Sequence, residues 1–165
     1  MADDADPVAV AREIALRQLT VRQRTRAELA AALARRNVPT EAAGEVLDRF
    51  TEVGLLNDAA FARDWVAAGA RRQRGRRVLA QELAQKGVAA ELIDEALAAR
   101  DPGDDAEAAL ALAQRKARSM AGLDRQVRYR RLSAALQRRG FGSGVIAAVV
   151  RQVLDDPELP DPDLE

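Results

Sequence analysis

Seven consecutive residues, "RRQRGRR" at 71–77, place five arginines around a single glycine. Guanidinium groups bind carboxylates and phosphates through paired hydrogen bonds, so this cluster indicates contact with an anionic partner. Two related clusters, "RQRTR" at 22–26 and "RQVRYRR" at 125–131, occur on either side of it along the chain. The candidate partner-binding residues are the arginines of these three clusters: Arg22, Arg24, Arg26, Arg71, Arg72, Arg74, Arg76, Arg77, Arg125, Arg128, Arg130 and Arg131.

The residue types on which most enzymes depend are missing. The chain has no histidine, the commonest general base and metal ligand, and no cysteine for a disulfide or a thiolate metal site. It also lacks a glycine-rich phosphate loop, and the acidic pairs in "DEAL" (94–97) and "DD" (104–105) are explained by the helix dipole, which favours carboxylates at helix starts. We therefore expect no enzymatic activity, no catalytic residue, no metal site and no cofactor.

Charge is distributed unevenly along the chain. The 26 basic and 26 acidic residues cancel overall, but three acids lie in "MADDAD" (1–6) and six in the proline-containing "DDPELPDPDLE" (155–165). Without these ends the chain has a net charge of +9. We expect a basic folded body with disordered acidic ends at 1–6 and 155–165. Because 24 of the basic residues are arginine, the position of an arginine is more informative than its presence.

The chain shows no sign of export or membrane insertion. Its start, "MADDADPVAV", has neither the basic region nor the apolar run of a secretory signal. No stretch approaches the ~18 apolar residues that a membrane helix needs. A cytoplasmic protein that contacts no membrane is expected, and we expect a monomer.

Three segments repeat one pattern. "RAELAAALARRNVPTEAAGEVL" (26–47) aligns with "RRVLAQELAQKGVAAELIDEAL" (76–97) at an offset of 50, and "RLSAALQRRGFGSGVIAAVV" (131–150) follows at an offset of 53. Each copy reads as a helix, a turn at Asn or Gly, an apolar residue and a second helix. Asn and Gly tolerate the left-handed conformation that ends a helix. The equivalent positions are Leu29, Leu79 and Leu132; Leu33, Leu83 and Leu136; Asn37, Gly87 and Gly140; and Val38, Val88 and Phe141.

A further helix precedes each pair, at about 7–23, 58–73 and 104–119. The sequence therefore predicts an all-α fold, an elongated array of three tandem three-helix repeats with about nine helices. Its units are expected at 7–56, 57–101 and 102–154. Predicted helix starts include Pro7 at N1, the capping box "TRAE" (25–28), Asn57 or Asp58, and N-caps at Thr40 and Ser143.

The arginine clusters fall at the corners between the first and second helices. Cations that end a helix, such as Lys116 and Arg138, complement the helix dipole and need no further purpose. Arginines in a first turn oppose the dipole, yet all three copies have them there. We expect the corners to form a basic stripe along one face that binds an extended anionic partner. Phe61 and Trp65 share one helix face and are expected to be structural.

A helix-turn-helix that binds DNA is a weaker interpretation of the same pattern. The helices that would enter the major groove, 41–48 and 91–97, are acidic, and DNA phosphates repel carboxylates. Only non-specific contact between the corners and the DNA backbone is compatible with this charge pattern. Aromatic residues number five in the whole chain, too few for a platform that stacks bases.

Several motifs resemble the RecX family of RecA regulators. "GLLNDAAFARDWV" (54–66) and then "ARRQRGRRVLAQELAQKGV" (70–88) resemble its acidic pair, Phe–Ala–x–x–aromatic–Val helix, basic corner and Leu–x–x–Lys–Gly–Val turn. Asn57 replaces the first acid of the pair, and Asn37 in "LARRNV" replaces the usual glycine. "LQRRGF" (136–141) resembles the last repeat. The resemblance extends over residues 12–154.

The resemblance implies a nine-helix, three-repeat modulator that binds RecA, free or in the groove of the RecA–DNA filament. Such a protein suppresses the ATPase, strand-exchange and co-protease activities of RecA and so regulates DNA repair, recombination and the SOS response. The alternative is a helical repeat protein that binds DNA non-specifically.

Overall fold

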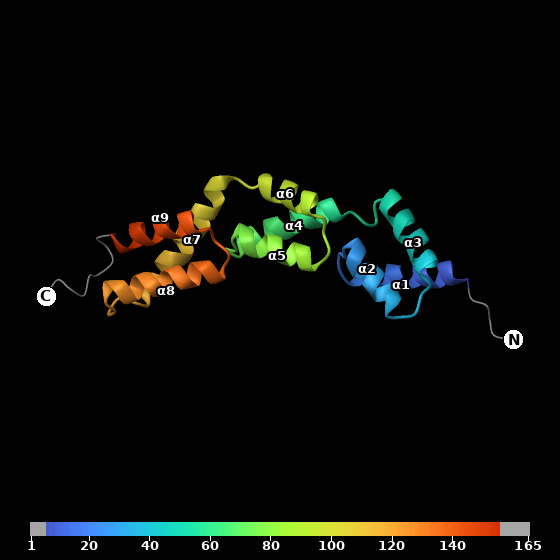
Figure 1. The fold of residues 1–165 in the computed structure, drawn as a ribbon, viewed down its shortest axis with the longest axis horizontal. Helices are drawn as coiled ribbons and strands as arrows, with labels where there is room; N and C mark the ends of the chain where they lie inside the picture. The colour runs from blue at the N-terminus through green and yellow to red at the C-terminus, as the bar shows by residue number, and fades with distance from the viewer. Residues whose placement is uncertain (1–5, 156–165) are drawn as a thin grey trace. The chain divides into compact units, whose positions relative to one another are not determined.

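The computed structural model describes residues 6–155, which form nine helices and no strand. The nine helices are α1 (Pro7–Val21), α2 (Arg26–Ala34), α3 (Thr40–Glu52), α4 (Asp58–Arg71), α5 (Arg76–Gln85), α6 (Ala90–Ala98), α7 (Pro102–Arg118), α8 (Arg125–Arg138) and α9 (Ser143–Leu154). Helices α1, α2 and α3 pack together, and so do α7, α8 and α9 (Figure 1). The predicted all-α fold with three three-helix repeats is confirmed.

Several helix starts follow the predicted chemistry. Pro7 opens α1, and the Asp6 carboxylate accepts a hydrogen bond from the backbone N–H of Val8. Thr25 and Glu28 form the complete capping box of α2. Asn57 caps α4 because its side-chain oxygen accepts the backbone N–H of Ala60 at 2.9 Å. These caps satisfy N–H groups that have no partner inside the helix.

The predicted N-caps at Thr40 and Ser143 are wrong. Both residues are the first residues of their helices, and the capping positions belong to Pro39 and Gly142, which make no side-chain cap. The backbone of Pro39, with ψ of 140°, and of Gly142, with ψ of 154°, already has the extended conformation of a capping residue. The hydroxyl groups therefore lie one residue too far along the chain to cap.

The turns between second and third helices use left-handed residues, as predicted. Asn37 has a φ of 57°, Gly87 of 78° and Gly140 of 86°. The apolar residue after each turn packs back over the helix end, where Val88 and Phe141 are buried and Val38 is partly buried against the core. Each turn thus closes its domain with one apolar side chain.

The leucines that define the repeat are core residues in every copy. All six are at most 1% exposed: Leu29, Leu33, Leu79, Leu83, Leu132 and Leu136. In the N-terminal part, α1, α2 and α3 pack around Leu29 and Leu33 with Phe50. In the C-terminal part, α7, α8 and α9 pack around Leu132 and Leu136.

Phe61 and Trp65 have structural roles, as predicted. Phe61 is 6% exposed. Trp65 is partly buried, and its indole N–H donates to a Glu82 carboxylate oxygen at 2.9 Å.

The chain divides into two compact units. One contains the chain up to Asp64 together with Leu83–Asp94, and the other contains Trp65–Glu82 together with the chain from Glu95 onward. Helices α4, α5 and α6 each continue from one unit into the other. The expected acidic ends lie outside the described residues except for Asp6, which caps α1, and Asp155, the capping residue at the C-terminal end of α9.

Each unit contains one joint, in which the turn that ends one second helix packs on the start of another second helix. In the first, the turn after α5 packs on the start of α2, where the Thr25 hydroxyl donates to the Lys86 carbonyl at 2.6 Å. In the second, the turn after α8 packs on the start of α5, where the backbone N–H of Gly75 donates to the Arg139 carbonyl at 2.8 Å. A Cβ on Gly87 would overlap Ala27, so the first joint needs a glycine.

Candidate binding surface

The first arginine of each second helix braces the third helix of the same repeat. Arg26 pairs with Asp48 in α3 at 2.6 Å. Arg76 donates to the carbonyls of Leu97 and Arg100 at the end of α6, each at 2.7 Å. The Arg76 guanidinium supplies donors where the last carbonyls of a helix lack partners.

Arg125 completes the set. It donates to the Leu154 carbonyl at the end of α9, at 2.9 Å, and pairs with Asp155. An arginine in a first turn opposes the dipole of its own helix, but these side chains lie at the negative end of another helix. The arginines that open the three second helices are therefore explained by the fold.

A buried ion-pair network surrounds Asp105 in α7. The Asp105 carboxylate pairs with Arg100 at 2.7 Å and with Arg76 at 3.2 Å. The side chains of Arg100 and Asp105 are only 3% and 8% exposed. Arg100 also donates to the carbonyl of Arg74 at 3.0 Å. The middle corner is thereby fastened to the start of α7.

Glu28 neutralises two cations at the start of α2. Its carboxylate pairs with Arg22 at 3.0 Å and with Lys86 at 3.1 Å. Burial, the largest single influence, raises the pKa of Glu28, but hydrogen bonds from Arg22, the Thr25 backbone and Lys86 together outweigh it and lower the pKa from 4.5 to about 2. Glu28 is thus a charged component of the joint.

Three further predicted site residues are paired or removed from the surface. Arg74 pairs with Glu82, the same carboxylate that binds Trp65. Arg128 is 2% exposed, and Arg24 is partly buried. These arginines contribute little accessible charge.

The remaining five predicted residues are exposed: Arg71, Arg72, Arg77, Arg130 and Arg131. Within residues 6–155 their side chains make no ion pair or hydrogen bond. Half-exposed Tyr129 lies beside Arg130. These five arginines are the part of the predicted set that the structure leaves available to a partner.

The middle and last clusters lie at opposite ends of α8. The middle cluster contacts its C-terminal end, where Arg139 donates to the Arg72 carbonyl at 3.3 Å. The last cluster lies at its N-terminal end, and because α8 begins at Arg125, this cluster forms two helical turns rather than a bend. The length of α8 separates the two clusters by about 20 Å.

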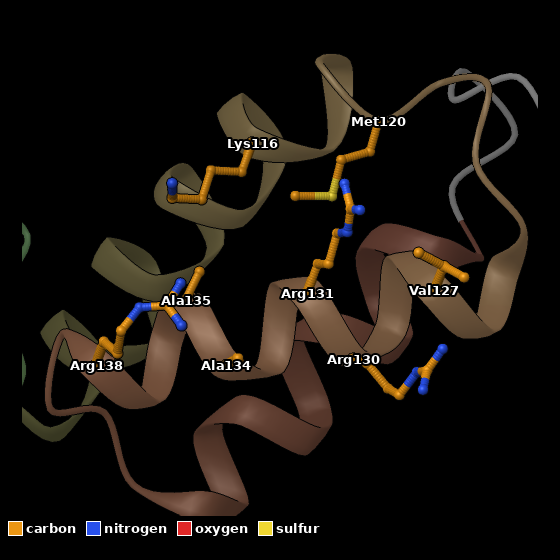
Figure 2. Close-up of a pocket in the computed structure, with 8 residues that line it drawn as sticks. All are labelled: Lys116, Met120, Val127, Arg130, Arg131, Ala134, Ala135 and Arg138. Carbon is orange, nitrogen blue, oxygen red and sulfur yellow. The ribbon is translucent and has the colours of Figure 1, made fainter.

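A basic groove of about 600 Å³ runs between the end of α7 and α8. Its eight lining residues are Lys116, Met120, Val127, Arg130, Arg131, Ala134, Ala135 and Arg138, none of which is acidic. Figure 2 shows Arg131 extending from α8 toward Met120 in the turn after α7, with Lys116 of α7 on the same side. The groove combines four cations with a floor of apolar side chains.

Sequence reasoning missed Lys116, Met120 and Arg138 as groove residues. Lys116 and Arg138 are the helix-end cations that the dipole explains without a further role, but the fold brings them together around one groove. The available signal was the spacing of Val127, Arg131, Ala134 and Arg138, which places these residues on one face of a helix.

No group of three or more acidic side chains in the described part of the chain is arranged to hold a metal ion. Among the same residues, no helix has the length and apolar character needed to cross a bilayer.

Family models match all three domains in order. The first three-helix domain of RecX matches residues 11–50, the second matches 57–97 and the third matches 103–150. The chain belongs to the RecX family. Every RecX domain model thus finds its counterpart in one three-helix group.

Relatives named "Regulatory protein RecX" are similar over most of the chain. The Streptomyces coelicolor protein is 51% identical over 152 residues, which cover 92% of this chain and 81% of the relative. The Thermobifida fusca protein is 40% identical over 163 residues, covering 96% and 88%. The chain is therefore a member of a family of regulatory proteins.

Two solved structures have the same fold. The crystal structure of RecX from Lactobacillus salivarius matches with a TM-score of 0.84 at 21% identity, covering 90% of this chain and 97% of that one. A second RecX crystal structure matches with a TM-score of 0.81 at 27% identity, covering 88% and 73%.

Proposed function

We propose that this RecX protein binds RecA, free or as a filament on DNA, and inhibits its ATPase, strand-exchange and co-protease activities in the cytoplasm. Membership of the RecX family across all three domains is the observation that carries this proposal. The unpaired arginines support it, because a filament on DNA presents a long anionic surface. The acids of α3 and α6, such as Glu45 and Asp94, are exposed, which disfavours insertion of these helices into a DNA groove.

The DNA-dependent ATPase of RecA tests the function directly. Inhibition by the chain at a small fraction of one molecule per RecA protomer would support binding to the filament. Inhibition only at amounts that coat the DNA would favour the alternative, a non-specific DNA-binding protein that competes for the lattice. Absence of inhibition at every ratio would overturn the proposal.

The middle corner can be tested with two sets of substitutions that separate binding from folding. Arg71, Arg72 and Arg77 have exposed side chains, whereas Arg74 and Arg76 hold Glu82 and the end of α6. The triple substitution R71A/R72A/R77A is expected to weaken inhibition and leave the thermal unfolding midpoint unchanged. R74A/R76A is expected to lower that midpoint. If the triple variant inhibits like the unmodified chain, the middle corner does not contact RecA.

A further inference from the structure

The starts of α2 and α5 each carry a face that receives the turn at the end of a later second helix. The relevant residue immediately precedes the first buried leucine of the helix. In α2 it is Glu28, which pairs with Lys86 of the turn after α5. In α5 it is Val78, which lies so close to Gly140 that a Cβ on this glycine would overlap the Val78 backbone. The face is therefore a docking position in both helices.

In α8 the equivalent residue is Arg131, and this face is open. Within residues 6–155 no backbone hydrogen bond joins a turn from another repeat to this face, and Arg131 is exposed. The open face is part of the basic groove, where Val127, Arg131, Ala134 and Arg138 recur along one side of α8. Residues 104–154 also carry a net charge of +6, compared with +2 for residues 7–55.

The two closed faces indicate the chemistry of an occupant. In each, the docked turn presents carbonyl oxygens: that of Lys86 accepts the Thr25 hydroxyl, and that of Gly140 accepts the Arg77 backbone N–H at 3.2 Å. In α8 the backbone N–H of Arg128 is already bonded to the Asp124 carbonyl at 2.9 Å. The available donors in α8 are side chains that carry full charge, which favour carboxylates over neutral carbonyls.

We propose that this groove is the docking site for a carboxylate-rich segment of the protein partner that also carries an apolar side chain. Lys116, Arg131 and Arg138 would pair with the carboxylates. Met120 would receive the apolar side chain, since a flexible thioether adapts to varied shapes. Ala134 and Ala135 leave room for a partner backbone to approach α8. That the occupant belongs to a protein rests on the proposed function.

Two other occupants fit the groove less well. Single-stranded nucleic acid binds through phosphates and through bases stacked on aromatic rings, and no aromatic ring lines this groove. A second copy of the chain would offer the turn after α2, but that turn carries exposed Arg35 and Arg36. These cations would be repelled by the four cations of the groove.

Fluorescence anisotropy of the full chain with a short labelled peptide of repeated Glu-Glu-Leu units tests the proposal. The double substitution R131A/R138A is expected to weaken binding at least about tenfold, because it removes two charge-assisted contacts. R35A/R36A, which removes the same charge from exposed positions in the turn after α2, is expected to change binding by less than about twofold. M120Q is expected to weaken binding by about threefold, as an apolar contact is lost.

Four results would overturn the proposal. The first is equal weakening by R131A/R138A and R35A/R36A. The second is peptide binding that a Gln-Gln-Leu peptide reproduces. The third is an oligothymidylate of equal charge that binds more tightly than the peptide and loses affinity in R131A/R138A. The fourth is dimerisation of the unmodified chain that R131A/R138A abolishes in sedimentation, which would assign the groove to a second copy.

RecA inhibition by the same variants separates this inference from the proposed function. If the unmodified chain fails to inhibit RecA, the proposed function is wrong and the peptide measurement still reports on the groove. If R131A/R138A loses the peptide but inhibits RecA like R35A/R36A, the proposed function stands and the assignment of the groove to that partner is overturned.

Discussion

Positions of α2 and α8 that are equivalent in the sequence repeat carry opposite charges and have different environments. In α2 the residue before the first buried leucine is Glu28, enclosed by Arg22 and Lys86. In α8 it is Arg131, exposed beside a groove with three other cations. One repeat position therefore serves as a closed joint in the first unit and as an open surface in the second.

The comparison separates arginines that hold the fold from arginines that are available to a partner. Arg26 and Arg76 occupy equivalent helix starts and both reach the end of a third helix. Arg131 and Arg138 find no carboxylate within residues 6–155. The clusters at 22–26 and 125–131 have a similar density of arginine. The intramolecular partners of the arginines, rather than their number, therefore identify the binding surface.

The largest expected effect on stability comes from breaking the most enclosed pair. Asp105→Ala leaves Arg100 buried without its carboxylate and removes a partner of Arg76. Loss of one partner of a buried ion pair costs about 3–5 kcal/mol, so we expect the free energy of unfolding in urea to fall by that amount. Asp104→Ala is the control, since Asp104 lies in the same first turn of α7 but is exposed.

The control is expected to change the free energy of unfolding by less than about 1 kcal/mol, the size of a first-turn dipole effect. Equal destabilisation by the two substitutions would mean that the Asp105 network contributes no more than a surface carboxylate. The middle corner would then lose its assignment as a structural element.

Most of the fold could be predicted because its determinants are local. The equivalence of Leu29, Leu79 and Leu132 follows from regular spacing, and the left-handed turns at Gly87 and Gly140 follow from backbone sterics. The predicted helix caps at Thr40 and Ser143 were wrong because the competing residue, at the preceding position, already had the capping backbone conformation.

The candidate surface could be predicted only in part, because it depends on contacts between distant residues. Nothing in the sequence pairs Arg100 with Arg74 or Arg125 with Leu154. Seven of the twelve predicted arginines are consequently paired or at least partly buried in the structure: Arg22, Arg24, Arg26, Arg74, Arg76, Arg125 and Arg128. Arg138, a cation at the end of a helix, also lines the groove, but only because the fold brings α7 beside α8.

The joint in the second unit can be broken by a single methyl group. Gly140→Ala forces a left-handed conformation on alanine and drives its Cβ into the backbone of Val78. The conformational cost of about 1–2 kcal/mol and the overlap together are expected to reduce the free energy of unfolding by about 2–4 kcal/mol. Gly54→Ala separates the two contributions, because Gly54 has a φ of 79° but open space around its Cα. A loss as small as that of Gly54→Ala would mean that this joint is not tightly packed.

The joint in the first unit is expected to respond to pH. The pKa of Glu28 is about 2 in the folded chain against 4.5 for a free glutamate. Because the folded pKa is the lower one, the ion pairs of Glu28 stabilise the fold fully above pH 4.5, and this contribution is lost as the pH falls toward 2. Glu28→Gln keeps the capping-box geometry and removes the charge.

At pH 7 the substitution is expected to lower the free energy of unfolding by about 1–2 kcal/mol, since Arg22 is partly exposed to solvent. The difference between variant and unmodified chain should then shrink between pH 4.5 and pH 2.5 in urea titrations. A constant difference over this interval would show that Glu28 acts through its shape rather than its charge.

The smallest expected effect concerns the open face of α8. R131A/R138A removes two side chains that have no intramolecular ion pair in the described chain and that are exposed. The free energy of unfolding is expected to change by less than about 0.5 kcal/mol, as for other surface substitutions. Lower repulsion among the four groove cations is expected to offset the small loss of packing along the arginine stems. Urea unfolding beside R35A/R36A measures the effect: a loss as large as that of Glu28→Gln would mean that α8, like α2, uses this position to hold the fold together.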